Sequence, residues 1–145
     1  MHDVSDKWIA NRVRWKMRRF TSPEMVLFPE GEIPVAHHLH DIAQIQAAGI
    51  PILAFWRSNE LWTLIASEKL VWVWDGEVRA LVLDTLKKVE EETLDEKAES
   101  VPKRLLETLY VTDANGSTFR VWVPLDGLWR LRAVLAMLIG MQKKP

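Results

Sequence analysis

Cysteine is absent from this chain of 145 residues. Disulfide frameworks, zinc sites built on thiolates, iron–sulfur clusters and cysteine nucleophiles are therefore excluded. A one-sided charge is missing as well, because 19 basic residues stand against 20 acidic ones and leave a formal net charge of −1. Nucleic-acid-binding proteins usually carry a clear basic excess, so we expect no nucleic-acid partner.

Long apolar runs are also missing. The longest runs from Ala133 to Met141 and holds nine residues, whereas a membrane-spanning helix needs about 20. The first 20 residues mix basic and apolar side chains, without the separate basic and apolar regions of a secretory signal. Together with the absent cysteine, these features favour a cytoplasmic protein.

Motifs of phosphate binding and nucleophilic catalysis are lacking too. The six glycines form neither a Walker loop nor a dinucleotide-binding fingerprint, and no serine lies in a G-x-S-x-G elbow. A pair of catalytic carboxylates could still meet in space, because spacing along the chain does not reveal such pairs. On balance we expect no enzymatic activity and no cofactor.

Residues 1–50 predict a helical extension. Apolar residues recur at helical spacing between basic ones, at Ile9, Val13, Met17 and Phe20. The apolar segment 25–28 predicts a short strand or an apolar plug. An apolar stripe over 35–48 predicts a second helix, which Gly49 and Pro51 would end.

From Pro51 onward, short apolar segments between turn residues predict strands. These segments are 52–56, 61–66, 70–74, 78–83, 86–89, 106–112 and 119–123. Asp75-Gly76 and the stretch 113–116 have the composition of hairpin turns. A final apolar segment, 127–141, predicts a helix with Asp126 as its N-cap.

The order of these strands and turns carries a family resemblance. Segment 61–84, LWTLIASEKLVWVWDGEVRALVLD, resembles bacterial PH-like and GRAM-type domains, in which strands alternate with short polar turns. The resemblance implies an α+β fold for residues 51–145: a PH-like antiparallel barrel or bent sheet of about seven strands, closed by a C-terminal helix. Lipid-binding members place several basic residues in the first loop between strands, where this chain has Arg57 together with Glu60.

Both faces of the predicted sheet are apolar. Trp72 and Trp74 point to one face of their strand, and Val71 and Val73 point to the other. Either the N-terminal helices cover the outer face, or that face contacts a partner or a second copy of the chain. Tryptophan is enriched in interface hot spots, and the residues that we expect at such an interface are Trp72, Trp74, Trp122 and Arg120.

The first 20 residues are basic, with six Lys or Arg against two Asp and a local net charge of +4. Trp8, Trp15 and Arg12 would form a second contact patch, suited to an anionic membrane surface or another anionic ligand. The plainer interpretation is a helix with its apolar face on the core and its basic face in water. The acidic segment 90–99, with a local net charge of −5, offers this helix an alternative partner.

Histidines cluster at 37–41. On a helix His37, His40 and Asp41 would share one face, and imidazoles with a carboxylate suit zinc or another transition metal. A polar, solvated helix face is the alternative. No histidine follows position 40, so the additional ligands of the HD phosphohydrolases, which the His-Asp pair resembles, are missing.

These features lead us to expect a non-enzymatic module for protein interaction or self-association. The first alternative is a peripheral membrane or anionic-ligand binder that uses the basic segment. The second is an enzyme with a metal ion at the histidine cluster.

Overall fold

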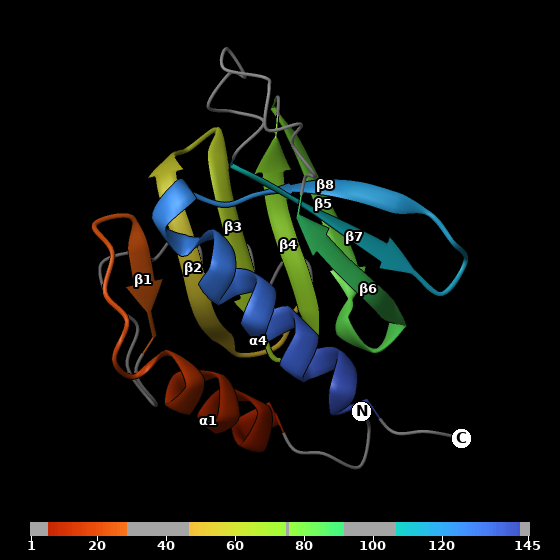
Figure 1. Ribbon diagram of the computed structural model, residues 1–145, viewed down its shortest axis with the longest axis horizontal. Coiled ribbons are helices and arrows are strands. Elements are labelled where there is room, and N and C mark those ends of the chain that lie inside the picture. Colours follow the sequence, from red (N-terminus) through yellow and green to blue (C-terminus); the bar gives the residue numbers. More distant parts are fainter. Residues whose placement is uncertain (1–5, 29–46, 75, 92–106, 143–145) are drawn as a thin grey trace.

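The computed structural model describes residues 6–28, 47–74, 76–91 and 107–142. Two antiparallel sheets and two long helices make up an α+β fold (Figure 1). In chain order the elements are α1 (Asp6–Met17), β1 (Met25–Leu27), β2 (Pro51–Ser58), β3 (Leu61–Ala66), β4 (Lys69–Trp74), β5 (Glu77–Val82), β6 (Leu86–Glu91), β7 (Thr108–Asp113), β8 (Thr118–Trp122) and α4 (Leu128–Gly140).

The strands divide between a five-stranded sheet, ordered β1-β2-β3-β4-β5, and a three-stranded sheet, ordered β6-β7-β8. The predicted α+β class, with an N-terminal and a C-terminal helix, is confirmed. The expected single barrel or bent sheet is not formed by the described residues. After β5 the chain makes a short 3-10 turn at Leu83–Thr85, and β6 then pairs with β7 instead of continuing the first sheet.

Two glycines with positive φ make the hairpin turns possible. Gly76, at φ +79°, lies between β4 and β5, where Trp74 pairs with Glu77. Gly116, at φ +82°, lies between β7 and β8. There the Asp113 carboxylate accepts hydrogen bonds from the backbone N–H groups of Asn115 and Ser117, at 2.9 and 3.0 Å. Both hairpins predicted from turn composition are confirmed.

One face of the five-stranded sheet is covered by the two helices. In Figure 1 α4 crosses in front of this sheet, and α1 lies beside it next to β2. α4 also packs against β6 and so contacts the second sheet. The largest members of this core are Trp72 and Trp122, each 1% exposed. Ile9, Val13 and Met17 enter the same core from α1, as the helical spacing predicts.

The opposite face of the sheet has a second apolar cluster. Val71 and Val73 of β4 join Trp62 and Leu64 of β3 there, and Phe28 packs among them. All five side chains are buried. The middle of β3 and of β4 is therefore buried on both faces.

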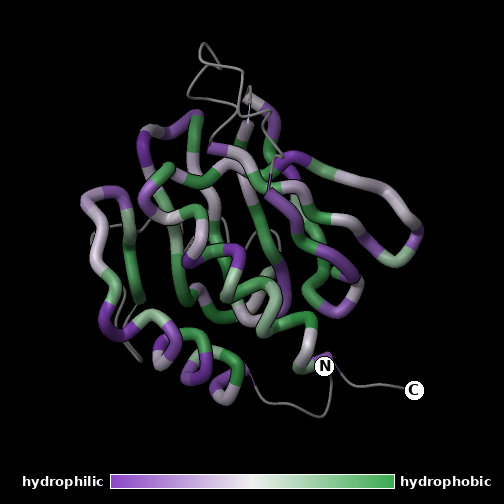
Figure 2. Tube along the Cα trace, in the orientation of Figure 1, coloured by the Kyte–Doolittle hydropathy of each residue, from purple (hydrophilic) through white to green (hydrophobic). Residues whose placement is uncertain are grey.

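The polar and apolar residues of α1 divide as a solvated basic helix requires. Hydrophilic and hydrophobic residues alternate along its turns (Figure 2). Ile9, Ala10, Val13 and Met17 are buried, whereas Arg12 and Lys16 are exposed. The prediction that the apolar side of this helix packs on the core is thus confirmed.

The predicted N-cap of the last helix is wrong. α4 starts at Leu128, after a 3-10 turn at Leu125–Gly127, and Gly127 occupies the capping position without a side-chain hydrogen bond. The Asp126 carboxylate instead accepts a hydrogen bond of 2.8 Å from the Ser22 hydroxyl. Asp126 is engaged by Ser22, a residue 104 positions away in the sequence, and the sequence around the helix gives no sign of this contact.

The N-terminal segment shares its core and its sheet with the rest of the chain. β1 pairs with β2, and α1 contributes to the cluster that holds Trp72 and Trp122. The division into residues 1–50 and 51–145 stays a prediction. The second predicted helix, 35–48, lies almost entirely outside the described residues.

Gly127 is a position where the fold tolerates no side chain. A Cβ placed there would lie 2.6 Å from Cε1 of Phe55, a buried residue of β2. We expect Gly127→Ala to lower the free energy of unfolding by about 1–3 kcal/mol, the usual cost of overpacking a core. Urea denaturation followed by circular dichroism measures it.

Gly140 is the matched control, because it lies in α4 and a Cβ there would meet nothing within 4 Å. Gly140→Ala should be neutral or stabilising, since alanine is the better helix former. Equal destabilisation by the two variants would contradict the close contact with Phe55.

Candidate functional site

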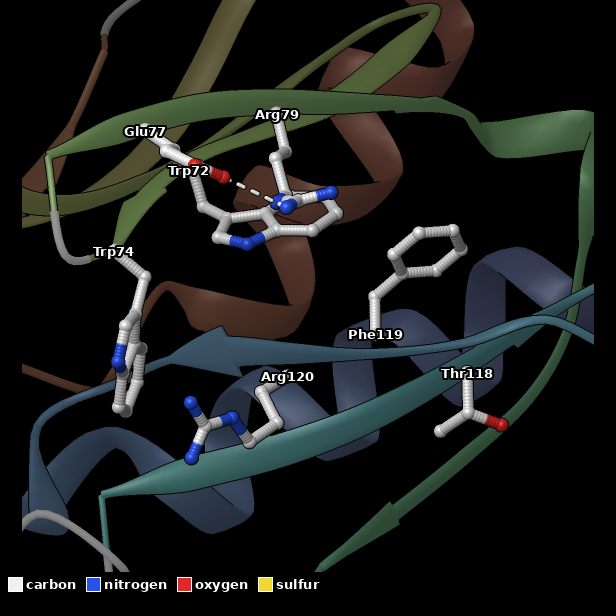
Figure 3. A pocket seen from close by; sticks show the side chains of 7 residues that line it. All are labelled: Trp72, Trp74, Glu77, Arg79, Thr118, Phe119 and Arg120. Carbon is white, nitrogen blue, oxygen red and sulfur yellow. Dashed lines mark hydrogen bonds and ion pairs between the residues drawn. The ribbon is translucent and has the colours of Figure 1, made fainter.

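A pocket of about 480 Å³ opens between the two sheets (Figure 3). Its walls come from β4 and β5 on one side and from β8 on the other. The lining residues are Trp72, Trp74, Glu77, Arg79, Thr118, Phe119 and Arg120. The volume falls within the range of about 300–1,000 Å³ that is usual for small-molecule sites.

The β4–β5 hairpin brings four of these residues together. Its register pairs Trp74 with Glu77 and Trp72 with Arg79. Alternate residues of a strand point to the same face, so the four side chains form one wall. β8 supplies the facing wall, and Phe119 on it meets Trp72 edge to face at 6.1 Å between ring centroids.

The charges at the pocket leave one guanidinium without an anionic partner. Arg79 donates a hydrogen bond of 2.7 Å to the Glu77 carboxylate. The guanidinium of Arg120 lies over the Trp74 ring, 5.3 Å from its centroid. Arg120 is exposed and forms no ion pair within the described part of the chain. The described lining residues thus hold two cations and one anion, an excess of one positive charge.

Trp72 has a buried indole N–H group that lacks a hydrogen-bond partner among the described residues. The residue as a whole is 1% exposed. In Figure 3 the ring nitrogen points toward the space between Trp74 and Arg120. A buried donor without a partner costs about 1–3 kcal/mol, so an acceptor that reached this N–H would be bound favourably.

A second charged cluster, around Arg57, joins segments of the fold that are far apart in the sequence. Arg57 at the end of β2 donates hydrogen bonds of 2.5 and 2.8 Å to Glu24, and of 2.8 and 2.7 Å to Glu107. Glu107 also accepts a hydrogen bond of 3.2 Å from the backbone N–H of Leu125. The Arg57 guanidinium lies 5.0 Å from the ring centroid of Trp122.

The contacts in this cluster shift the pKa values of Arg57 and Glu107. Burial alone would raise the pKa of Glu107, but the hydrogen bonds and the charge of Arg57, with the Leu125 N–H, outweigh burial and lower it. Hydrogen bonds first to Glu24 and then to Glu107 raise the pKa of Arg57 further above its ordinary value. Arg57 and Glu107 therefore both stay ionised at neutral pH.

Of the four residues expected at a partner interface, three line the pocket and one lies in the core. Trp74 and Arg120 lie at the opening of the pocket, where both are at least partly accessible. Trp72 forms the inner end of the pocket. Trp122 is buried in the core instead, where its carbonyl accepts a hydrogen bond of 2.5 Å from the Thr63 hydroxyl.

The expected patch on the first helix is exposed. Trp8 is 45% and Trp15 57% accessible. Two guanidinium groups lie over the Trp15 ring, that of Arg18 at 3.9 Å and that of Arg12 at 6.0 Å from its centroid. These residues cover the solvent side of α1, opposite its buried side.

The histidine cluster cannot be placed, because His37, His40 and Asp41 lie outside the described residues. Within the described ranges, no three His, Asp or Glu side chains are close enough to hold a metal ion. Neither α1 nor α4, the two long helices of the described part, is long and apolar enough to cross a membrane.

Sequence reasoning missed several pocket residues. Glu77 and Arg79 carry a usable signal, because a tight turn at 75–76 fixes their register against Trp74 and Trp72. Thr118 and Phe119 carry none, since the approach of β8 to β4 depends on how the two sheets pack.

Comparison of the chain with protein-family models, with curated proteins and with solved structures finds no significant match. The functional argument therefore depends on the geometry of the chain itself.

Removing the charge of Glu107 should destabilise the protein in a pH-dependent way. We expect Glu107→Gln to lower the free energy of unfolding at pH 7 by about 1–3 kcal/mol, because charge-assisted hydrogen bonds to Arg57 are lost. A lowered carboxyl pKa stabilises the fold above the unfolded value of about 4.3, and this contribution disappears as the pH falls through the folded value.

The deficit of the variant should therefore shrink on acidification, as measured by urea denaturation from pH 7 to pH 3. Glu60→Gln, at an exposed position in the β2–β3 turn, is the control and should match the unsubstituted protein. A deficit that is independent of pH would contradict the role of the Glu107 charge.

Proposed function

We propose that the protein is a non-catalytic interaction module of PH-like fold, in which the pocket between the sheets receives a segment of a partner protein. The observation that carries the proposal is Arg120, which lies exposed over Trp74 at the opening of this pocket. A cation close to an aromatic ring is attracted to it, and Arg and Trp are both enriched in binding hot spots.

The order of elements supports the PH-like part of the proposal. Strands β2 to β5 form consecutive antiparallel hairpins in one sheet, β6 to β8 do so in the other, and α4 then packs against β6 and β7. This is the strand order and the closing helix that the family resemblance implies. α1 and β1 are additions before it. A cytoplasmic location, expected from composition, belongs to the same proposal.

A protein segment suits the place of the pocket. β5 and β8 are each the last strand of their sheet in the described part of the chain. An edge strand has backbone N–H and C=O groups on its outer side that an extended segment can pair with. The lining side chains of both strands would then contact the side chains of that segment.

Photo-cross-linking in cells tests this function. With benzoylphenylalanine in place of Thr118, at the pocket, we expect a cross-link to one defined protein segment, identified by mass spectrometry. Adding Arg120→Glu should weaken the cross-link at least about tenfold, which corresponds to a loss of about 1.4 kcal/mol. Arg130→Glu is the matched charge reversal, because Arg130 is exposed on α4 and lies over Phe20.

The same cross-linker at Glu60, an exposed residue of the β2–β3 turn, shows the background. A product that is a second copy of this chain, with the mass of a dimer in light scattering, assigns self-association. Equal products at positions 118 and 60, or a product that Arg120→Glu leaves unchanged, would contradict the proposal.

A second candidate function is favoured by the patch on α1. Helices that lie at an anionic membrane surface combine tryptophan with Lys and Arg. Trp15, with Arg12 and Arg18 over its ring, fits this pattern. On this alternative, α1 would insert its outward indoles among lipid headgroups while its apolar face stays on the core.

Liposome flotation separates this candidate from the first. If α1 binds membranes, the protein floats with vesicles that contain phosphatidylserine and stays down with phosphatidylcholine alone. Trp15→Ser should then abolish flotation. Trp129→Ser is the matched control, because Trp129 is 60% exposed on α4. Flotation that ignores lipid charge, or that both variants lose equally, rules this function out.

A further inference from the structure

The pocket presents two polar groups with unused binding capacity and two aromatic walls. Arg120 has no carboxylate partner in the described ranges, and the indole N–H of Trp72 has no acceptor there. Trp74 and Phe119 supply the aromatic surface. Their combination indicates what kind of chemical group this pocket recognises.

We infer that the pocket binds a carboxylate that is joined to a flat apolar group, most simply an aromatic ring. The inference rests on the proposed function only in one respect, namely that the carboxylate belongs to a protein segment. A free small carboxylate has the same chemistry, and the experiment below separates the two sources.

Arg120 provides the recognition of charge. A guanidinium is a planar fork of N–H donors that matches a carboxylate with two parallel hydrogen bonds. The guanidinium lies over the Trp74 ring, 5.3 Å from its centroid, and this contact engages no N–H donor in an ion pair. The contact also restricts the side chain before binding, which lowers the entropic cost of fixing it.

Trp72 provides a second donor deeper in the pocket. Its ring nitrogen points to the side on which Arg120 lies (Figure 3), so an anion held by Arg120 is brought toward this N–H. The group is buried and without a described partner. A hydrogen bond formed in such a low-dielectric place is stronger than one formed in water.

The charge of the lining selects for a single negative charge. Glu77 already neutralises Arg79 through their hydrogen bond of 2.7 Å, and among the described lining residues Arg120 alone remains. A phosphate monoester, with nearly two negative charges at pH 7, would leave one of them unpaired and close to Glu77. A carboxylate matches the one remaining cation.

The aromatic walls select for a flat apolar group beside the carboxylate. Phe119 and Trp72 meet edge to face, and Trp74 stands across the opening from Phe119 in Figure 3. An aromatic ring of the bound molecule would pack against these side chains in the offset or edge-to-face arrangements that such rings prefer.

Nitrogen-15 NMR of the eight indole N–H groups tests the inference. Trp72→Phe identifies the Trp72 resonance, and if that variant does not fold, the contact with Phe119 identifies it instead. The probes are phenylacetate with its neutral counterpart phenylacetamide, and the peptide acetyl-Gly-Phe-Asp-Gly-amide with its Asn counterpart. We expect both carboxylates to shift the Trp72 resonance saturably, with dissociation constants at least about tenfold below those of the neutral probes.

Arg120→Gln should remove the shift, and Arg130→Gln, which changes an arginine stacked on Phe20, should leave it. Binding of phenylacetate without the acidic peptide supports the carboxylate site and overturns its use for a protein segment. Equal binding of the Asp and Asn peptides keeps the protein-interaction function and overturns the carboxylate. If no probe shifts the Trp72 resonance at about 10 mM, a concentration at which a Kd of 1 mM would give near saturation, the inference is wrong.

Discussion

The guanidinium of Arg57 connects parts of the molecule that are far apart in the chain. It lies at the end of β2, binds Glu24 before β1 and Glu107 before β7, and covers the ring of Trp122 at the end of β8. Through Glu107 it also reaches the backbone N–H of Leu125, just before α4. The N-terminal segment, both sheets and the turn before the last helix therefore meet at one charged group. Glu107 is 8% exposed, so the loss of its partner would leave an unpaired and largely desolvated carboxylate.

The pocket depends on this arrangement although Arg57 does not line it. Trp122 and Arg120 are two residues apart on β8, so they point to the same face of that strand. The first is held by the core, by Arg57 and by the hydrogen bond from Thr63, and the second lies over Trp74. The position of β8 against β4 is thus set at one end by buried contacts. At the other end it leaves Arg120 and Phe119 facing the hairpin that carries Trp72.

Local patterns were sufficient for the strands and turns. Alternation and turn residues predict β3 at 61–66, the bounds that it has, and they predict α4 to within a residue at each end. The tight turn at 75–76 also fixes the strand register that pairs Arg79 with Trp72. The contacts that local patterns omit join distant residues. Arg57 and Glu107 are 50 residues apart, and the division into two sheets depends on which strand β6 pairs with. The different fates of Trp74 and Trp122, one at an opening and one in the core, follow from the packing of the sheets, which no period in the sequence encodes.

The order of the strands also determines when, during synthesis of the chain, the pocket can form. β2 to β5 are consecutive hairpins, and hairpins with short turns close in microseconds. These strands can therefore pair while the ribosome is still adding the residues that follow. β8 and the Glu107 carboxylate come from the last third of the sequence, and α4 comes after both. One wall of the pocket is thus present early in synthesis, and the other arrives only near its end. A chain whose synthesis stops before β8 carries Trp72 and Trp74 without the strand that covers them, and in that state their rings are a surface for chaperones instead of a binding site.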